Sequence, residues 1–139
     1  PALVMHFFDS KDGLFAAVLA GLEEVRPRIL AAINDGSADS GRRLVGAYME
    51  LWEDPEMGAN IRSLVRGAIG SRQATAVVHD FLVGVDATQP IDPGLALAGG
   101  QLLGVAIARY VLEAAPLADM PLDELVERIG PSIQRQLDP

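Results

Sequence analysis

Residues 92–115 read DPGLALAGGQLLGVAIARYVLEAA, and this stretch decides the fold. Asp92 can cap a helix with its side chain and Pro93 suits the first helical position, so a helix is predicted from Pro93 to about Ala115. The helix is apolar nearly all round, and such a helix must be covered on most of its sides. We expect its own domain to cover one part of it and another subunit to cover the rest.

A membrane is the other possible cover for this helix, and the sequence argues against it. The apolar run from Leu95 to Ala108 contains Gln101 and is followed by Arg109. It is therefore shorter than the roughly 20 residues that span a bilayer. No basic and apolar leader follows Pro1, where we expect upstream sequence to be missing. These features predict a buried helix in a cytoplasmic protein.

The rest of the chain repeats the helical spacing of apolar residues, interrupted by residues that start or end helices. Ser10 is the expected cap of a first helix, in which Pro27 should cause a bend or a restart. Pro116 is expected to end the helix that begins at Pro93, and Pro131 to kink the last helix. The loops are short, which predicts a compact all-α bundle. The expected helices cover residues 11–33, 41–53, 55–69, 74–85, 93–115 and 121–137.

The composition fits one helical domain and excludes several functions. Of the 139 residues 50% are hydrophobic and only 5% are aromatic, which allows a sizeable core and favours helices over strands. The net charge of −8 repels phosphate, so these residues alone are not expected to bind DNA. The absence of cysteine excludes disulfides and thiolate chemistry.

Motifs for nucleotide binding, metal binding and catalysis fail on inspection. The run from Gly99 to Gly104 has Gln101 in place of the middle glycine of a dinucleotide loop, and Val105-Ala106 in place of the Lys-Ser/Thr of a P-loop. His79 has no second ligand at metal-binding spacing. The nucleophile motif Gly-x-Ser-x-Gly does not occur. We therefore expect no enzyme activity, no cofactor and no metal.

Small residues recur every four positions on the apolar helix. Gly100, Gly104 and Ala108 would form a smooth ridge along which another backbone can approach closely. A contact between two subunits is one interpretation of this ridge. Close packing between helices of the same subunit is the alternative, because small residues serve both purposes.

Aromatic and methionine side chains suggest where a ligand could bind. Flexible thioethers and amphipathic rings can line a cavity that accepts varied apolar molecules, although each of these residues could equally belong to an ordinary core. Arg66 and Arg109 lie on apolar stretches, where an ion pair with a carboxylate is favoured over contact with an anionic ligand. The candidate pocket residues are Tyr48, Met49, Trp52, Met57, Val65, Phe81 and Tyr110.

Residues 3–15, LVMHFFDSKDGLF, resemble the end of the DNA-binding domain of TetR-type transcriptional regulators. Phe8, Ser10, Lys11 and Leu14 match the family's core phenylalanine, helix cap, lysine and core leucine, whereas Met5 and Phe7 depart from its pattern. The resemblance implies that residues 1–9 are a remnant of a helix-turn-helix domain and that residues 10–139 form the effector-binding and dimerisation domain. Lys11 and His6 would then contact DNA phosphates.

The same resemblance implies a function and an assembly. It predicts a TetR-like homodimer joined through the last two helices as a four-helix bundle, with Leu125, Ile129 and Ile133 beside the glycine ridge. A small apolar effector would bind inside each subunit and release a repressor from operator DNA. The alternative is a small helical interaction module whose apolar helix docks onto a different protein, without DNA binding.

Overall fold

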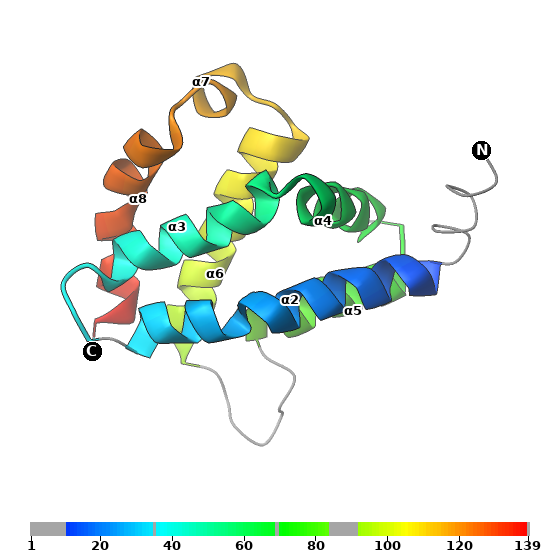
Figure 1. Ribbon diagram of the computed structural model, residues 1–139, viewed down its shortest axis with the longest axis horizontal. Coiled ribbons are helices and arrows are strands. Elements are labelled where there is room, and N and C mark those ends of the chain that lie inside the picture. The colour runs from blue at the N-terminus through cyan, green and yellow to red at the C-terminus, as the bar shows by residue number, and fades with distance from the viewer. Residues whose placement is uncertain (1–10, 35, 69, 84–91, 139) are drawn as a thin grey trace.

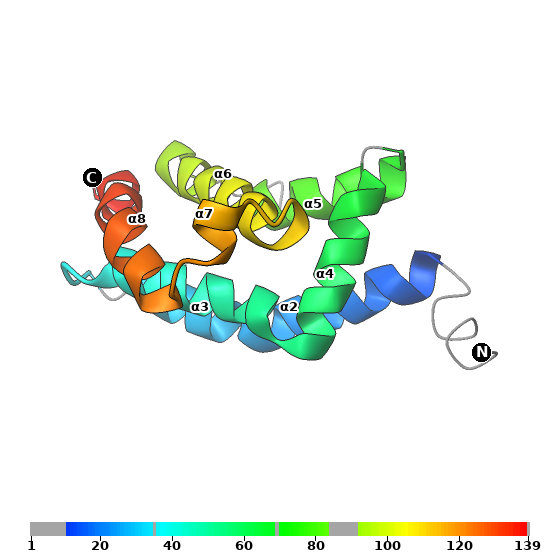
Figure 2. The same ribbon diagram turned by 90° about the horizontal axis from the view of Figure 1, so that it is seen from above.

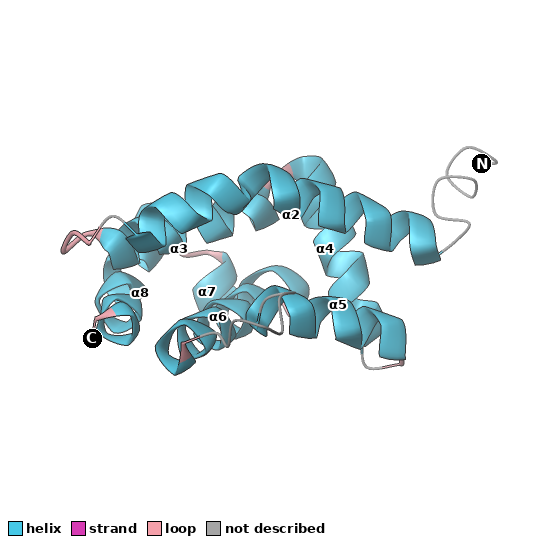
Figure 3. Ribbon diagram, turned by 90° about the horizontal axis from the view of Figure 1, so that it is seen from below, coloured by secondary structure: helices cyan, strands magenta, loops and turns pink. Residues whose placement is uncertain are grey.

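The computed structural model describes residues 11–34, 36–68, 70–83 and 92–138, and the described residues form helices and connecting turns without a strand (Figure 3). The all-α prediction is therefore confirmed for this part of the chain. The elements are α2 (Lys11–Asn34), α3 (Ser40–Glu53), α4 (Pro55–Ala68), α5 (Arg72–Val83), α6 (Pro93–Ala106), the π-helix η1 (Ile107–Val111), α7 (Ala115–Ala118) and α8 (Leu122–Leu137).

The helices form two layers with a core between them (Figures 1 and 2). Helices α2 and α3 lie in one layer, and α5 and α6 lie in the other. Helix α4 crosses between the layers at one end of the molecule, α8 closes the other end, and α7 lies along one edge between the end of α6 and the start of α8. Helix α3 packs against α8, α2 and α4, so it is the central element of the fold.

Helix α3 supplies most of the core because its apolar residues follow helical spacing. Leu44, Val45, Tyr48, Met49 and Trp52 recur at intervals of three and four and are all buried. Arg43 and Glu50 lie exposed on the opposite side. The helix therefore presents one broad apolar face to α8 and to the interior.

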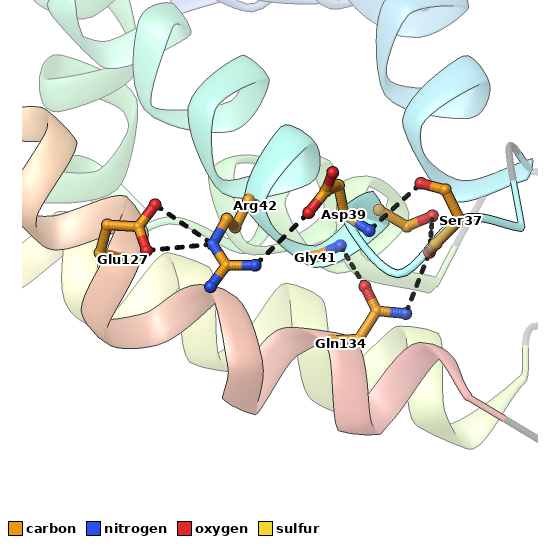
Figure 4. A network of polar contacts seen from close by, with 7 residues as sticks. Ser37, Asp39, Gly41, Arg42, Glu127 and Gln134 are labelled. Carbon is orange, nitrogen blue, oxygen red and sulfur yellow. Dashed lines mark hydrogen bonds and ion pairs between the residues drawn. The ribbon is translucent and has the colours of Figure 1, made fainter.

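The crossing of α3 and α8 depends on Gly41 and Gly130, and Figure 4 shows the polar contacts that surround Gly41. A Cβ atom built on Gly41 would overlap the carbonyl oxygen of Gly130 on α8. The backbone N–H of Gly41 donates to Oε1 of Gln134 at 2.7 Å, and Arg42 forms an ion pair with Glu127 at 3.2 Å. These polar contacts stand on either side of a backbone approach that only glycine permits.

Two predicted helix boundaries are confirmed, and one predicted proline effect needs correction. Helices α4 and α6 begin at Pro55 and Pro93, as predicted. Helix α2 contains Pro27 and α8 contains Pro131, and each is one continuous helix; the bends expected at these two prolines stay predictions. Pro116 does not end the apolar helix, because it lies in the first turn of α7, where a missing N–H is tolerated.

The apolar helix ends at Val111 rather than near Ala115. Its last turn is a π-helix, in which the N–H of Leu112 donates to the carbonyl oxygen of Ile107 at 2.8 Å. Glu113 then takes a positive φ of 51°, which turns the chain toward α7. The helix therefore ends several residues before Pro116, which was predicted to end it.

Much of the apolar helix is exposed in the single chain. Pro93–Val111 is long and apolar enough to cross a membrane by length and composition, and 22% of its most apolar window is buried. Leu97 is 61% exposed and Leu112 is 69% exposed. The expectation that the apolar segment is too short to span a bilayer is therefore wrong. The expectation that the segment is buried is wrong for the isolated subunit, because one face of α6 and η1 lacks a covering helix.

Candidate ligand-binding site

A small apolar cavity of about 40 Å³ lies in the interior between the two layers. Helices α2, α3, α4, α5 and α6 all contribute to its wall, so a change in its size would involve both layers. Among the residues that the structure describes, no charged side chain lines it. The lining residues are Val18, Leu22, Tyr48, Leu51, Trp52, Ile61, Leu64, Val65, Val78 and Leu103.

Two aromatic residues of α3 give this cavity its few polar atoms. Tyr48 and Trp52 are one helical turn apart and both are buried. Trp52, whose indole can only donate, hydrogen-bonds to the side chain of Tyr48. Burial raises the pKa of the Tyr48 phenol well above its usual value, and the bond from Trp52 lowers it slightly. The phenol therefore stays neutral, which suits an uncharged ligand.

Tyr110 stands behind Trp52 and connects the cavity to η1. The two rings are stacked with centroids 5.7 Å apart and planes 11° apart. The Tyr110 hydroxyl donates to Oε2 of Glu53 at 2.5 Å. Burial, followed by the bond to Glu53, raises the pKa of Tyr110 to about 12. Movement of the Trp52 ring would consequently disturb this stack directly.

Arg109 holds the end of η1 against the connection to α8. The residue is 8% exposed, and its Nη1 donates to the carbonyl oxygens of Leu117 at 2.5 Å and Met120 at 2.6 Å. Its Nη2 lies 3.6 Å from Glu53, so the predicted ion pair with a carboxylate is confirmed. The guanidinium also lies 5.3 Å from the centre of the Tyr110 ring. Arg66, in contrast, is exposed in the last turn of α4.

The structure brings together some of the candidate pocket residues. Tyr48, Trp52 and Val65 line the cavity, and Tyr110 stacks behind Trp52. Met49 is fully buried but is not part of the cavity wall. Met57 lies outside the cavity, in a separate groove described below. The side chain of Phe81 falls outside the part of the structure that is described.

The remaining wall residues were missed because they are ordinary aliphatic side chains. Leucine, isoleucine and valine at helical spacing indicate a core, and nothing in the spacing separates a cavity wall from a packed interior. Val18 and Leu22 of α2 are the most consequential omissions, because they bring the N-terminal helix into the wall.

The predicted interface residues fall into two groups. Gly100 and Gly104 are exposed, and a Cβ atom built on either meets nothing within 4 Å. Ala108 and Ile129 are half-buried. Leu125 and Ile133 are 1% and 0% exposed, and they belong to the subunit's own core. We correct the prediction for these last two, because their side chains have almost no surface left for a partner.

The predicted DNA contacts and domain boundary cannot be placed. His6 and residues 1–9 lie outside the described residues, and Lys11 is the first residue of α2 with its side chain not described. Among the described residues, no group of three or more His, Cys, Asp or Glu side chains is arranged to hold a metal ion.

The fold and the cavity define an all-helical domain with an internal apolar pocket and an exposed apolar helix. Residues 38–137 match the family model described as the C-terminal domain of tetracyclin repressor-like proteins. The chain therefore belongs to the TetR family of transcriptional regulators, which is the family that residues 3–15 resemble.

The fold is similar to that of a solved member of this family. The crystal structure of a TetR-family regulator from Streptomyces coelicolor A3 matches with a TM-score of 0.62 and 26% sequence identity. The match covers 98% of this chain and 75% of that chain. No curated protein matches the sequence significantly.

Proposed function

We propose that this chain is the effector-sensing and dimerising part of a cytoplasmic TetR-type repressor, and that its effector is a small, uncharged, largely apolar molecule. The observation that carries the proposal is the interior cavity, whose described wall residues include no charged side chain. A charged ligand placed there would lose its hydration without a compensating partner. The tyrosine and tryptophan offer at most one or two hydrogen bonds to orient an apolar ligand.

Effector binding requires the cavity to expand, and this expansion would provide the signal. A volume of about 40 Å³ accommodates little more than one water molecule, whereas ligand pockets usually span about 300–1,000 Å³. Val18 and Leu22 would be displaced with the wall, and α2 with them. The effector would lower operator affinity only to the extent that it binds the expanded state more tightly than the unexpanded state. Family membership supports this scheme, in which α2 connects the sensor to an N-terminal DNA-binding segment.

Binding can be tested with the chain's single tryptophan, which lies in the cavity wall. N-phenyl-1-naphthylamine, an uncharged apolar probe, is expected to quench Trp52 emission with saturation. Val65→Phe should weaken this binding at least about tenfold, because the larger ring occupies the cavity. Leu112→Phe, at an exposed position outside the cavity, is the control and should leave the affinity unchanged. Equal binding by both variants would place the probe elsewhere and contradict the proposal.

We further propose a homodimer that covers the exposed face of α6, with Leu97, Gly100, Gly104 and Ile129 in the contact. The alternative of close packing inside the subunit is disfavoured, because the two glycines meet no neighbouring atoms there. The other face of the helix is already engaged in the subunit, where Gln101 and Ser132 exchange hydrogen bonds of 2.9 and 3.1 Å with α8. Family membership favours a second copy over an unrelated protein.

The dimer predicts a specific response to substitution at the open glycines. Gly104→Arg should weaken dimerisation at least about tenfold in analytical ultracentrifugation, because it puts a charge into an apolar contact. Its helical circular dichroism should be retained, since the position is open in the subunit. Gly67→Arg on α4, which is equally open, serves as the matched control. A wild-type chain that sediments as a monomer at micromolar concentration would refute the proposed assembly.

A further inference from the structure

A second concave site, separate from the cavity, lies among α2, α3 and α4. We call it the outer groove; it has a volume of about 630 Å³, large enough for a small organic molecule. Leu51 belongs to the walls of both sites and separates them. Met57 was predicted to line the interior pocket, but it lines the outer groove instead.

Small side chains make the groove deep. Ala17, Ala20, Gly21 and Ala47 line it and leave room between the helices. A Cβ atom built on Gly21 would overlap the terminal methyl group of Met57, so the absence of a side chain there admits the thioether of α4. These groups together give the groove an apolar lining suited to the hydrocarbon part of a ligand.

The charged residues of the groove leave an excess of negative charge. Arg28 and Glu50 form an ion pair with each other. Asp54 caps α4, accepting hydrogen bonds from the N–H groups of Glu56 and Met57 at 3.1 and 2.8 Å. The carboxylates of Glu24 and Glu56 line the same groove and have no ion-pair partner among the described residues. An anion is therefore disfavoured, although a helix begins here, because Asp54 already occupies that helix end.

Asn60 provides an independent indication of a ligand. Its residue is 6% exposed, yet its side-chain amide lines the outer groove and has no hydrogen-bond partner within the described part of the chain. Its polar atoms are reached from the groove rather than sealed from it, since neither of them is a fully buried atom without a partner. The amide oxygen can accept a hydrogen bond from a donor placed in the groove.

We propose that the outer groove binds a small organic cation, in which a primary ammonium group is attached to a short hydrocarbon chain. The ammonium group carries three N–H donors and a positive charge, which suit the Asn60 amide oxygen and the carboxylates of Glu24 and Glu56. The hydrocarbon chain lies over the small residues and Met57. This site is distinct from the effector cavity and would operate whether or not that cavity binds an apolar effector.

The test uses 1,4-diaminobutane as the probe and the ¹⁵N-labelled chain at constant ionic strength. The amine should shift the Asn60 side-chain amide and Gly21 backbone amide signals in a saturable manner at millimolar concentration. The neutral analogue 1,4-butanediol should not. Asn60→Leu is expected to weaken binding of the amine about tenfold, and Glu24→Gln is expected to weaken it at least about threefold.

A neighbouring glutamate supplies the matched control. Glu23 pairs with Arg26 at 2.9 Å and does not line the groove, so Glu23→Gln removes the same charge from the same helix and should leave the affinity unchanged. The proposal is overturned if the diol binds equally well, if Glu23→Gln and Glu24→Gln act alike, or if saturable shifts are absent at 10 mM amine, about the weakest affinity of use. Shifts centred on the Trp52 indole would likewise overturn it, because they would place the amine in the cavity.

Discussion

Replacing Gly41 by alanine is expected to destabilise the fold by about 3 kcal/mol, because overpacking at a rigid contact costs this much. The added methyl group would overlap the carbonyl oxygen of Gly130 and lie 2.7 Å from the backbone nitrogen of Gln134. Both obstacles are backbone atoms of α8, so no side-chain rotation can relieve them. Urea unfolding followed by circular dichroism at a fixed protein concentration measures the loss.

Gly46 gives this prediction a control on the same helix. A Cβ atom built there meets nothing within 4 Å. Gly46→Ala should therefore stabilise the chain by about 0.5 to 1 kcal/mol, the usual gain when alanine replaces glycine inside a helix. The two substitutions make the same chemical change with opposite expected signs. Equal effects would mean that the α3–α8 crossing is looser than described.

Removing the charge of Arg109 is the second change with a large expected effect. Arg109→Met keeps the apolar length but deprives the carbonyl oxygens of Leu117 and Met120 of their donor, and Glu53 of its cation. A loss of about 3 kcal/mol is expected, because the buried guanidinium makes two hydrogen bonds to these carbonyl oxygens, and each bond to a charged group contributes about 1.5 to 3 kcal/mol. Thermal unfolding at matched concentration would report it.

Arg128 is the matched arginine for this experiment. It pairs with Glu124 at 3.0 Å on the surface of α8, where its side chain is 67% exposed. Surface pairs of this type contribute about 0.5 kcal/mol or less, so Arg128→Met should change the stability very little. If the Arg109 variant is equally mild, then water replaces its contacts, and η1 is held mainly by its apolar packing.

Local signals in the sequence predicted where helices begin, and failed where tertiary contacts set the backbone. Asp54-Pro55 and Asp92-Pro93 place a capping acid before a proline, and this chemistry fixes the starts of α4 and α6 whatever lies nearby. The end of the apolar helix depends instead on Arg109, which contacts carbonyls 8 and 11 residues further along the chain. Such contacts produce no periodic pattern in the sequence.

The candidate site was predicted to the extent that residue type reveals it. Tyr48 and Trp52 stand out because large amphipathic rings are scarce in this chain. The aliphatic wall residues do not, since burial against a cavity and burial against a neighbour require the same side chains. The outer groove was missed for a different reason. The alanine and glycine residues that line it leave space between the helices, and that space exists only where α2 packs against α4.

The uninterrupted course of α2 has a mechanical consequence. Val18 and Leu22 contact the cavity, while Lys11 begins the same helix about 10 Å further along, at 1.5 Å per residue. A single helix transmits a tilt as a rigid rod, so a small outward push near its middle moves its far end through a larger arc. In a homodimer the two rods would tilt in symmetry-related directions, and the distance between their ends would change by twice the displacement of either.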